Sequence, residues 1–311
     1  MSDARTIDRP RGRSAAWLPE RVDGRIRLLA WLNLIGNVVI IGTGGAVRLT
    51  GSGLGCPTWP MCTPESLVPT AALVDDGIHS LIEFGNRMMS PILGILALVL
   101  LVLVWRLRES RRDLFVLAWI IMGGIVAQAV VGGITVLTGL NPYIVGFHYI
   151  ASLVLVCVCT VVVVRCHDGA GARERAVPAW FAVLSHVTGL ALAVTIVFGV
   201  LTTGSGPHSG DATVVRDGFD ASLLAHVHSW PGYILAGLVL VLTIAAFALR
   251  LPPRAWLVAL AVVIAVQVFV GVWQAREGLP PLLVGVHMVL AAISASVYTV
   301  VVLRLKRRVA G

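Results

Sequence analysis

The sequence has few charged residues for its length. Asp, Glu, Lys and Arg make up only 13% of its 311 residues, whereas soluble domains carry roughly 25%. Hydrophobic residues make up 57%, and the mean hydropathy is +0.89. The core of a soluble protein of this size does not need so many apolar residues. The composition therefore argues against a soluble globular protein and indicates a membrane protein.

The sequence also lacks the motifs of several common functional classes. It has no phosphate-binding loop, no dinucleotide-binding motif and no Ser-His-Asp arrangement. Its net charge of +8 lies in short clusters between apolar runs and does not form one basic face, so we expect no nucleic-acid partner. Glycines are frequent at 42–55, but this stretch ends an apolar run, where close helix packing explains them.

Apolar segments long enough to cross a bilayer, which takes roughly 20 helical residues, occur eight times. The predicted spans are 28–47, 88–105, 114–136, 143–164, 179–202, 229–249, 255–273 and 282–303. The connections alternate between arginine-rich and arginine-poor. Because basic loops stay cytoplasmic, we expect both termini inside and the long loops 48–87 and 203–228 outside. The expected location is the inner membrane of a bacterium.

The sequence contains an internal repeat. Leu140-Asn-Pro-Tyr-Ile-Val-Gly-Phe-His148 matches Leu279-Pro-Pro-Leu-Leu-Val-Gly-Val-His287, and Thr-Gly-Ser-Gly follows both the first and the fifth span. An even number of spans per copy gives both copies the same orientation. We therefore predict an all-α integral membrane protein of two tandem four-helix bundles related by a pseudo-twofold axis. The predicted parts are a basic segment 1–27, the halves 28–164 and 179–303, a linker 165–178 and a basic tail 304–311.

Histidines recur near the outer ends of the predicted helices. His148 lies about 9 Å below the outer loop, and His287 lies at the same place in the second copy. His228 enters the sixth span from the same side. Imidazoles from two facing helices at similar depth are typical axial ligands of a heme. We expect His228 and His287 to bind one heme, with His226 as a secondary candidate because it lies on another face of the same helix.

The first half differs from the second at one position. In the ungapped repeat Asn86 takes the place of His228, although another register places Glu83 opposite His226. A heme held by His148 alone keeps one coordination position open, which suits substrate chemistry. Glu83 lies one turn before Asn86 and Arg87 and is the candidate for proton transfer or for orienting a reacting group. His79 is a secondary candidate above this site.

Three further groups belong to the outer side. Arg48 and Arg87 either pair with heme propionates or extend to the interface as ordinary snorkelling arginines. Cys56 and Cys62 lie in the first outer loop, where the oxidising environment favours a disulfide over two free thiols. Cys157 and Cys159 are interpreted as small core residues.

The stretch Gly44-Gly-Ala-Val-Arg-Leu-Thr-Gly-Ser-Gly-Leu-Gly-Cys-Pro-Thr-Trp-Pro60 closely resembles the signature of the heme A synthase family. Ile82-Glu-Phe-Gly-Asn-Arg87 and the two Val-Gly-x-His segments fit the same family, so the resemblance extends from about 28 to 303. It implies an enzyme that oxidises the C8 methyl of heme O to the formyl group of heme A. It also implies a heme b cofactor in the second half.

Carried over residue by residue, the resemblance makes His228 and His287 the heme b ligands and His148 the ligand of the substrate iron. Glu83 matches the essential glutamate of the family, and Cys56 and Cys62 match its outer-loop cysteine pair. Many members have histidine three residues after the glutamate, whereas this chain has Asn86. The expected partners are heme O, heme A and membrane lipid, together with a heme O synthase and an electron acceptor.

Two other functions are consistent with parts of the pattern. A non-catalytic diheme cytochrome b would relay electrons, but it does not explain Glu83 or the replacement of a histidine by Asn86. A transporter built from parallel repeats requires a polar site at the middle of the membrane, where this sequence is almost entirely aliphatic.

Overall fold

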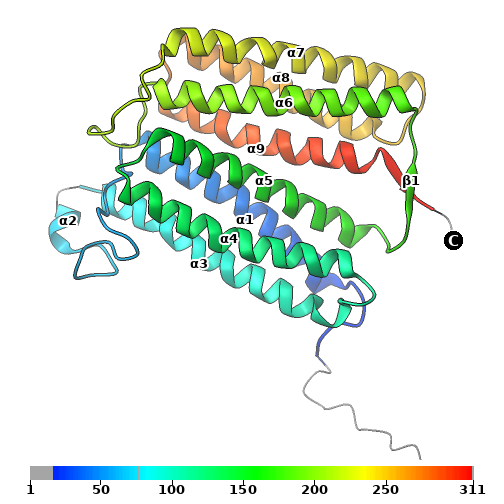
Figure 1. Cartoon of the computed structure of the whole chain (residues 1–311), viewed down its shortest axis with the longest axis horizontal. Coiled ribbons are helices and arrows are strands. Elements are labelled where there is room, and N and C mark those ends of the chain that lie inside the picture. The colour runs from blue at the N-terminus through cyan, green and yellow to red at the C-terminus, as the bar shows by residue number, and fades with distance from the viewer. Residues whose placement is uncertain (1–16, 76, 310–311) are drawn as a thin grey trace, which may run out of the picture.

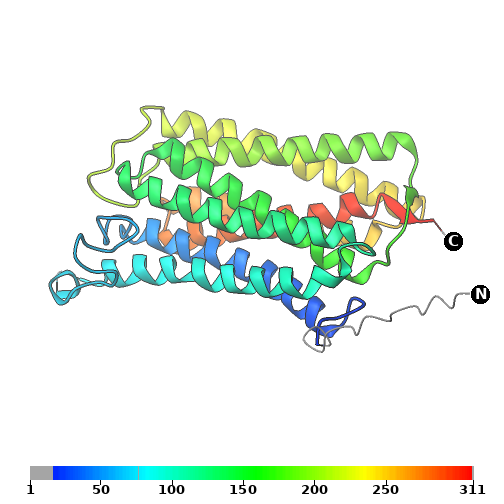
Figure 2. The ribbon, with the colours of Figure 1, turned by 60° about the horizontal axis from the view of Figure 1, so that its bottom comes forward.

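The computed structural model describes residues 17–75 and 77–309. Long helices run side by side through the whole molecule (Figures 1 and 2). They are α1 (Gly24–Leu49), α3 (His79–Val104), α4 (Arg112–Leu137), α5 (Pro142–His167), α6 (Ala179–Ser205), α7 (Ala221–Ala248), α8 (Arg254–Arg276) and α9 (Pro281–Leu303). A short helix α2 (Ala71–Asp75) lies in the α1–α3 connection, and a 3-10 turn η2 (Trp105–Leu107) extends α3.

Eight of the described helices are long and apolar enough to cross a membrane, which confirms the eight predicted spans. The chain is therefore a multi-pass membrane protein. The predicted starts of two spans are wrong, because α3 begins at His79 rather than at 88 and α7 at Ala221 rather than at 229. Polar residues such as Glu83 and His228 lower the hydropathy of these first turns, yet the backbone there is helical.

The helix ends repeat as closely as the sequence does. Leu140 and Leu279 both adopt a left-handed backbone conformation, with φ of 59° and 63°. Their N–H groups donate to the carbonyls of Thr135 and Gln274, each at 2.7 Å, which closes the ends of α4 and α8 in the same way. Pro142 and Pro281 then open the next helices at a position where no intrahelical N–H is needed. These matched turns place His148 and His287 at the same depth in their halves.

Each half forms a ring of four helices. In the first half α1 contacts α3, α3 contacts α4, α4 contacts α5, and α5 contacts α1; in the second half α6, α7, α8 and α9 follow the same order. The halves meet through α5 against α9, with α1 against α9 and α5 against α6 on either side. A pseudo-twofold axis relates α1 to α6 and α5 to α9, so it predicts that the α1–α9 contact is matched by an α5–α6 contact.

Short strands that the sequence did not predict join the halves at the end of the bundle where α1 begins and α9 ends. β1 (Arg173–Arg175) pairs antiparallel with β2 (Lys306–Arg308), and Glu174 forms an ion pair with its partner Arg307 at 2.8 Å. Arg304 also forms an ion pair with Asp168 at 2.9 Å. We call the opposite end, which carries the connections 50–78 and 206–220, the long-loop end (Figure 1).

Candidate functional site

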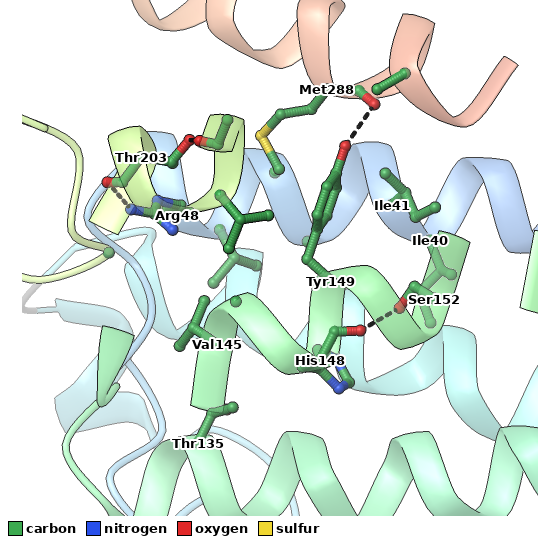
Figure 3. A pocket seen from close by; sticks show the side chains of 18 of the residues that line it. Ile40, Ile41, Arg48, Thr135, Val145, His148, Tyr149, Ser152, Thr203 and Met288 are labelled. Carbon is green, nitrogen blue, oxygen red and sulfur yellow. Dashed lines mark hydrogen bonds between the residues drawn. The ribbon is translucent and has the colours of Figure 1, made fainter. Parts of the chain in front are cut away.

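A cavity of about 420 Å³ lies between the halves and is lined by residues of all eight long helices. The predicted site residues His148, His228, His287, Asn86, Glu83, Arg87 and Arg48 all line it. Figure 3 shows His148 and Arg48 on different sides of this space. The structure thus brings residues from distant parts of the chain to one cavity.

Two histidines face each other in the second half. The rings of His228 on α7 and His287 on α9 lie with their centroids 6.2 Å apart. His228 Nδ1 donates to the carbonyl of Thr195 at 2.9 Å, which leaves Nε2 available. A histidine that binds a metal commonly donates its other ring N–H to a carbonyl in this way.

Glycines on neighbouring helices make room for all three histidines. A β-carbon on Gly199 would lie 2.9 Å from His228 Cε1, and one on Gly271 would lie 3.0 Å from His287 Cε1. In the first half a β-carbon on Gly132 would lie 3.5 Å from His148 Cε1. Each imidazole therefore rests against a bare stretch of helix backbone.

The helices that carry His148 and His287 are held by equivalent glutamines. Gln128 donates to the carbonyl of His148 at 3.0 Å, and Gln267 donates to the carbonyl of His287 at 3.1 Å. Nδ1 of both histidines is buried and has no hydrogen-bond partner among the described residues. The sequence offered a signal for these glutamines, because they share the offset of 139 that relates the two histidines.

Within the described part of the chain, the first half has no second histidine facing His148 across the cavity. Asn86 lines the cavity there, and its Oδ1 accepts a hydrogen bond from Thr43 at 2.7 Å. His79, a predicted candidate, does not line the cavity; its Nδ1 pairs with Ser52 Oγ at 2.8 Å. Among the described residues, the first half therefore presents His148 as its one imidazole in the cavity.

Glu83 and Arg87 form a buried ion pair one turn apart on α3. Arg87 Nε lies 3.0 Å from Glu83 Oε1, and the two side chains are 15% and 5% exposed. Glu83 Oε2 accepts from the backbone N–H of Cys56 at 2.8 Å. The carboxylate thus lines the cavity and also fixes the start of the loop above it.

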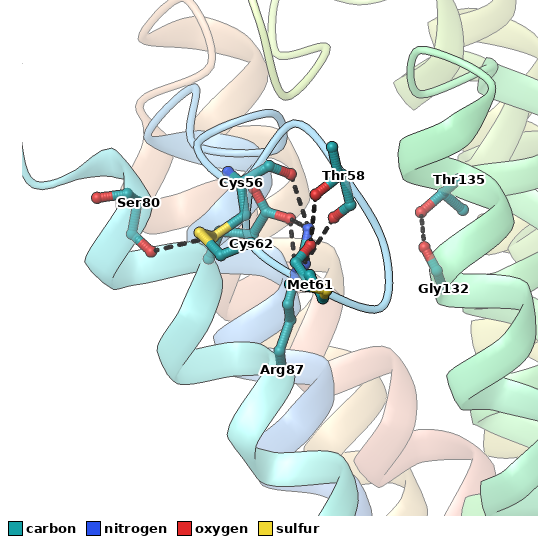
Figure 4. Close-up of polar contacts among 9 residues, drawn as sticks. Cys56, Thr58, Met61, Cys62, Ser80, Arg87, Gly132 and Thr135 are labelled. Carbon is teal, nitrogen blue, oxygen red and sulfur yellow. Dashed lines mark hydrogen bonds and ion pairs between the residues drawn. A yellow bond between two sulfur atoms is a disulfide. The ribbon is translucent and has the colours of Figure 1, made fainter. Parts of the chain in front are cut away.

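Arg87 is fully engaged by this loop (Figure 4). Beyond its contacts with Glu83, it donates to the carbonyls of Cys56 and Thr58, each at 2.8 Å, and of Met61 at 3.3 Å. A guanidinium group has five N–H donors, and these contacts use all of them. In this structure Arg87 therefore clamps the loop and has no free donor for a propionate.

The predicted disulfide between Cys56 and Cys62 is present and closes this short loop. Cys159 is buried and Cys157 is partly buried, in agreement with their interpretation as core residues.

Arg48 joins the two halves at the long-loop end. It donates from Nε to the carbonyl of His208 at 2.7 Å and from Nη2 to the carbonyl of Thr203 at 2.6 Å. Figure 3 shows the contact with Thr203. His208, which was not predicted as a ligand, binds the carbonyl of Leu279 through Nε2 at 2.8 Å. These contacts close the cavity at this end.

His226 lies apart from the site. It is exposed, it does not line the cavity, and its Nδ1 bonds to the carbonyl of Ser222 on its own helix.

Two aromatic residues of the cavity escaped prediction. Tyr149 on α5 donates to the carbonyl of Met288 on α9 at 3.0 Å, across the boundary of the halves (Figure 3). Trp59, between the two cysteines, also lines the cavity. Neither position can be placed in a cavity without knowing how the halves and the loop pack.

The residues present fit the hemes that the sequence predicts. The second half offers two facing imidazoles on an apolar cavity, one of them already oriented by a carbonyl. The first half offers one imidazole whose buried Nδ1 has no hydrogen-bond partner in the described part of the chain. This donor set suits iron held by one histidine in one half and by two in the other.

Comparisons with known proteins find a family and several relatives that are similar to the chain. The model of the COX15-CtaA family, described as cytochrome oxidase assembly protein, matches residues 27–209, a shorter range than the 28–303 expected from the motifs. A heme A synthase of Alkalihalophilus pseudofirmus is 27% identical over 147 residues, which are 47% of this chain and 48% of that protein.

Heme A synthases of two other bacteria are similar to the chain. That of Listeria welshimeri is 32% identical over 130 residues, 42% of this chain and 41% of that protein. That of Halalkalibacterium halodurans is 30% identical over 146 residues, 46% of this chain and 47% of that protein. Each match spans less than half the length of these curated relatives.

Proposed function

The chain belongs to the COX15-CtaA family of cytochrome oxidase assembly proteins, and we propose that it has heme A synthase activity. It would oxidise the C8 methyl group of heme O to the formyl group of heme A. The family match and the names of the relatives support this reaction. The observation that carries it is the unequal number of histidines that the two halves contribute to one cavity. The first half contributes one histidine, and the second half contributes two.

In this proposal the second half holds a heme b cofactor through His228 and His287. Thr195 and Gly271 fix the positions of these rings, and both imidazoles would hold the heme iron. A closed bis-histidine site suits electron transfer rather than reaction with a substrate. The second half would therefore pass on the electrons removed in the first.

The first half holds the substrate heme through His148. Bound heme would supply the iron redox chemistry. Two hydroxylations of the methyl group would give a geminal diol, which loses water to form the formyl group. With water as the source of oxygen, the conversion releases four protons and four electrons, and the electrons pass to the electron acceptor. Asn86 is a poor ligand for heme iron, so His148 would hold this iron without a second imidazole from the described residues of the first half. Glu83 is the carboxylate that lines this part of the cavity, and we assign to it the movement of protons or the orientation of the reacting group.

We place the site near the outer face of a bacterial inner membrane, with both termini cytoplasmic, because the arginine-rich connections lie at the opposite end. Heme O would enter from the membrane lipid. A heme O synthase would supply the substrate, and an electron acceptor in the membrane would reoxidise the cofactor.

Co-expression with a heme O source, followed by extraction of the pigments, tests this function. The proposal predicts that heme A accumulates. Protein that binds heme but leaves heme O unchanged would rule it out.

A further inference from the structure

The loop clamped by Arg87 reaches across the long-loop end from α3 to α4. Trp59 lies at the tip of this loop, between Cys56 and Cys62, and its indole packs on Gly133. A β-carbon on Gly133 would lie 2.5 Å from Trp59 Cε2, a separation that real β-carbons do not show. Position 133 must therefore be glycine for the indole to occupy this place.

Trp59 and His148 lie against consecutive residues of α4. The imidazole rests against Gly132, the indole rests against Gly133, and both side chains line the cavity. Consecutive α-carbons are about 3.8 Å apart, although their side chains point about 100° apart on a helix. The indole is therefore within reach of a tetrapyrrole held by His148.

The second half has no equivalent of this arrangement. Gly132 corresponds to Gly271, but Gly133 corresponds to Val272, which carries a β-branched side chain where the first half needs a glycine. The connection 206–220 contains neither tryptophan nor cysteine. The packing of an indole on a helix glycine is thus specific to the half that is proposed to bind the substrate heme.

We propose that Trp59 is a substrate-binding residue of the first half, which packs its indole against the tetrapyrrole held by His148 and covers it at the long-loop end. This inference rests on the proposed function. An indole supplies a large flat apolar surface that stacks on other aromatic systems. Glu83 and Arg87 are then also positioning residues, because their contacts with Cys56, Thr58 and Met61 hold the loop in place.

Titration of the purified protein with heme O, followed by the absorbance of the first-half heme, tests the inference. Trp59→Ala should raise the dissociation constant of heme O at least about tenfold, while Trp59→Phe stays within about threefold of wild type. Gly133→Ala should also weaken binding, because it displaces the indole. Gly123→Ala on the same helix, where a β-carbon meets nothing within 4 Å, should have no effect.

The double variant Trp59→Ala/Gly133→Ala gives the sharpest result. If Gly133 acts through the indole, the double variant binds heme O as Trp59→Ala does, whereas independent effects multiply. Multiplied effects, or wild-type affinity in Trp59→Ala, overturn the role of Trp59. The heme retained by His228 and His287 shows that each variant is folded. Wild-type protein that binds no heme O in its first half would instead contradict the proposed function itself.

Discussion

The two halves share a backbone plan and differ in what they place on it. Gln128 and Gln267 hold equivalent histidines, and the turns at Leu140 and Leu279 are the same. The first half adds a clamped, disulfide-closed loop and lacks the second histidine. The comparison teaches that two copies of one backbone plan can differ in function: under the proposed function, a few differences at the long-loop end separate a cofactor site from a substrate site.

The largest expected effect on heme binding is the loss of the second-half heme from His287→Ala. The variant removes one of the two proposed axial ligands, and we expect the heme affinity of the second half to fall about a hundredfold or more. This is a larger loss than substitutions of residues that only support the ligands cause. The heme content of the purified protein measures this. His226→Ala is the matched control, because His226 is exposed and outside the cavity; heme loss in the control would contradict the assignment of His228.

Glu83→Ala should affect the first half alone. It leaves the guanidinium of Arg87 without its buried partner, which costs about 3–5 kcal/mol, and it should reduce turnover about 10²- to 10⁴-fold. Conversion of heme O, measured by pigment extraction, and the content of second-half heme are the two readouts. Full conversion in Glu83→Ala would remove Glu83 from the mechanism.

Reduction or removal of the disulfide tests whether the order of the first outer loop depends on this bond, which the second half lacks. Cys56 and Cys62 are six positions apart, so their bond should stabilise the ordered loop by about 2 kcal/mol. In Cys56→Ser/Cys62→Ser we expect faster amide hydrogen exchange at 56–62, with unchanged exchange in α6 and α7. Unchanged exchange in the loop would show that the Arg87 contacts alone hold it.

Asn86→His should make the first half resemble the second. Asn86 lines the cavity and corresponds in the repeat to His228, so a histidine there would supply a second imidazole to the first-half heme. We expect a second low-spin bis-histidine heme and about tenfold tighter heme binding in the first half. Absorbance and electron paramagnetic resonance spectra measure both; a spectrum identical to wild type would show that position 86 does not face the iron.

The smallest effects are expected from the glutamine pair. Gln128→Leu and Gln267→Leu each remove one hydrogen bond to a histidine carbonyl, worth about 1 kcal/mol, or roughly fivefold in affinity. Gln128→Leu should weaken heme binding in the first half only, and Gln267→Leu in the second half only. Each variant is the control for the other, and equal effects on both hemes would argue against separate sites.

Much of the fold was predictable because long apolar runs and basic loops report spans directly. The starts of α3 and α7 were misplaced because the polar residues of the site interrupt the hydropathy of a continuous helix. The pairing of β1 with β2 depends on two charged segments far apart in the chain. Local patterns carry no information about such a contact.

The residues of the candidate site were predictable at the positions that match in the internal repeat. His148, His287, His228 and Asn86 line the cavity, as their matching positions suggest. The contacts of Arg87 with loop carbonyls and of Trp59 with Gly133 were not predictable. They arise from a loop conformation that has no counterpart in the second half.

The coordination of the two hemes tests the central difference between the halves most directly. Electron paramagnetic resonance of protein loaded with heme b and heme O should show one low-spin bis-histidine heme, which His287→Ala removes. It should also show one heme with an open coordination position, which His148→Ala removes. Two low-spin bis-histidine hemes in the wild-type protein would contradict the account and favour a diheme cytochrome b that only transfers electrons.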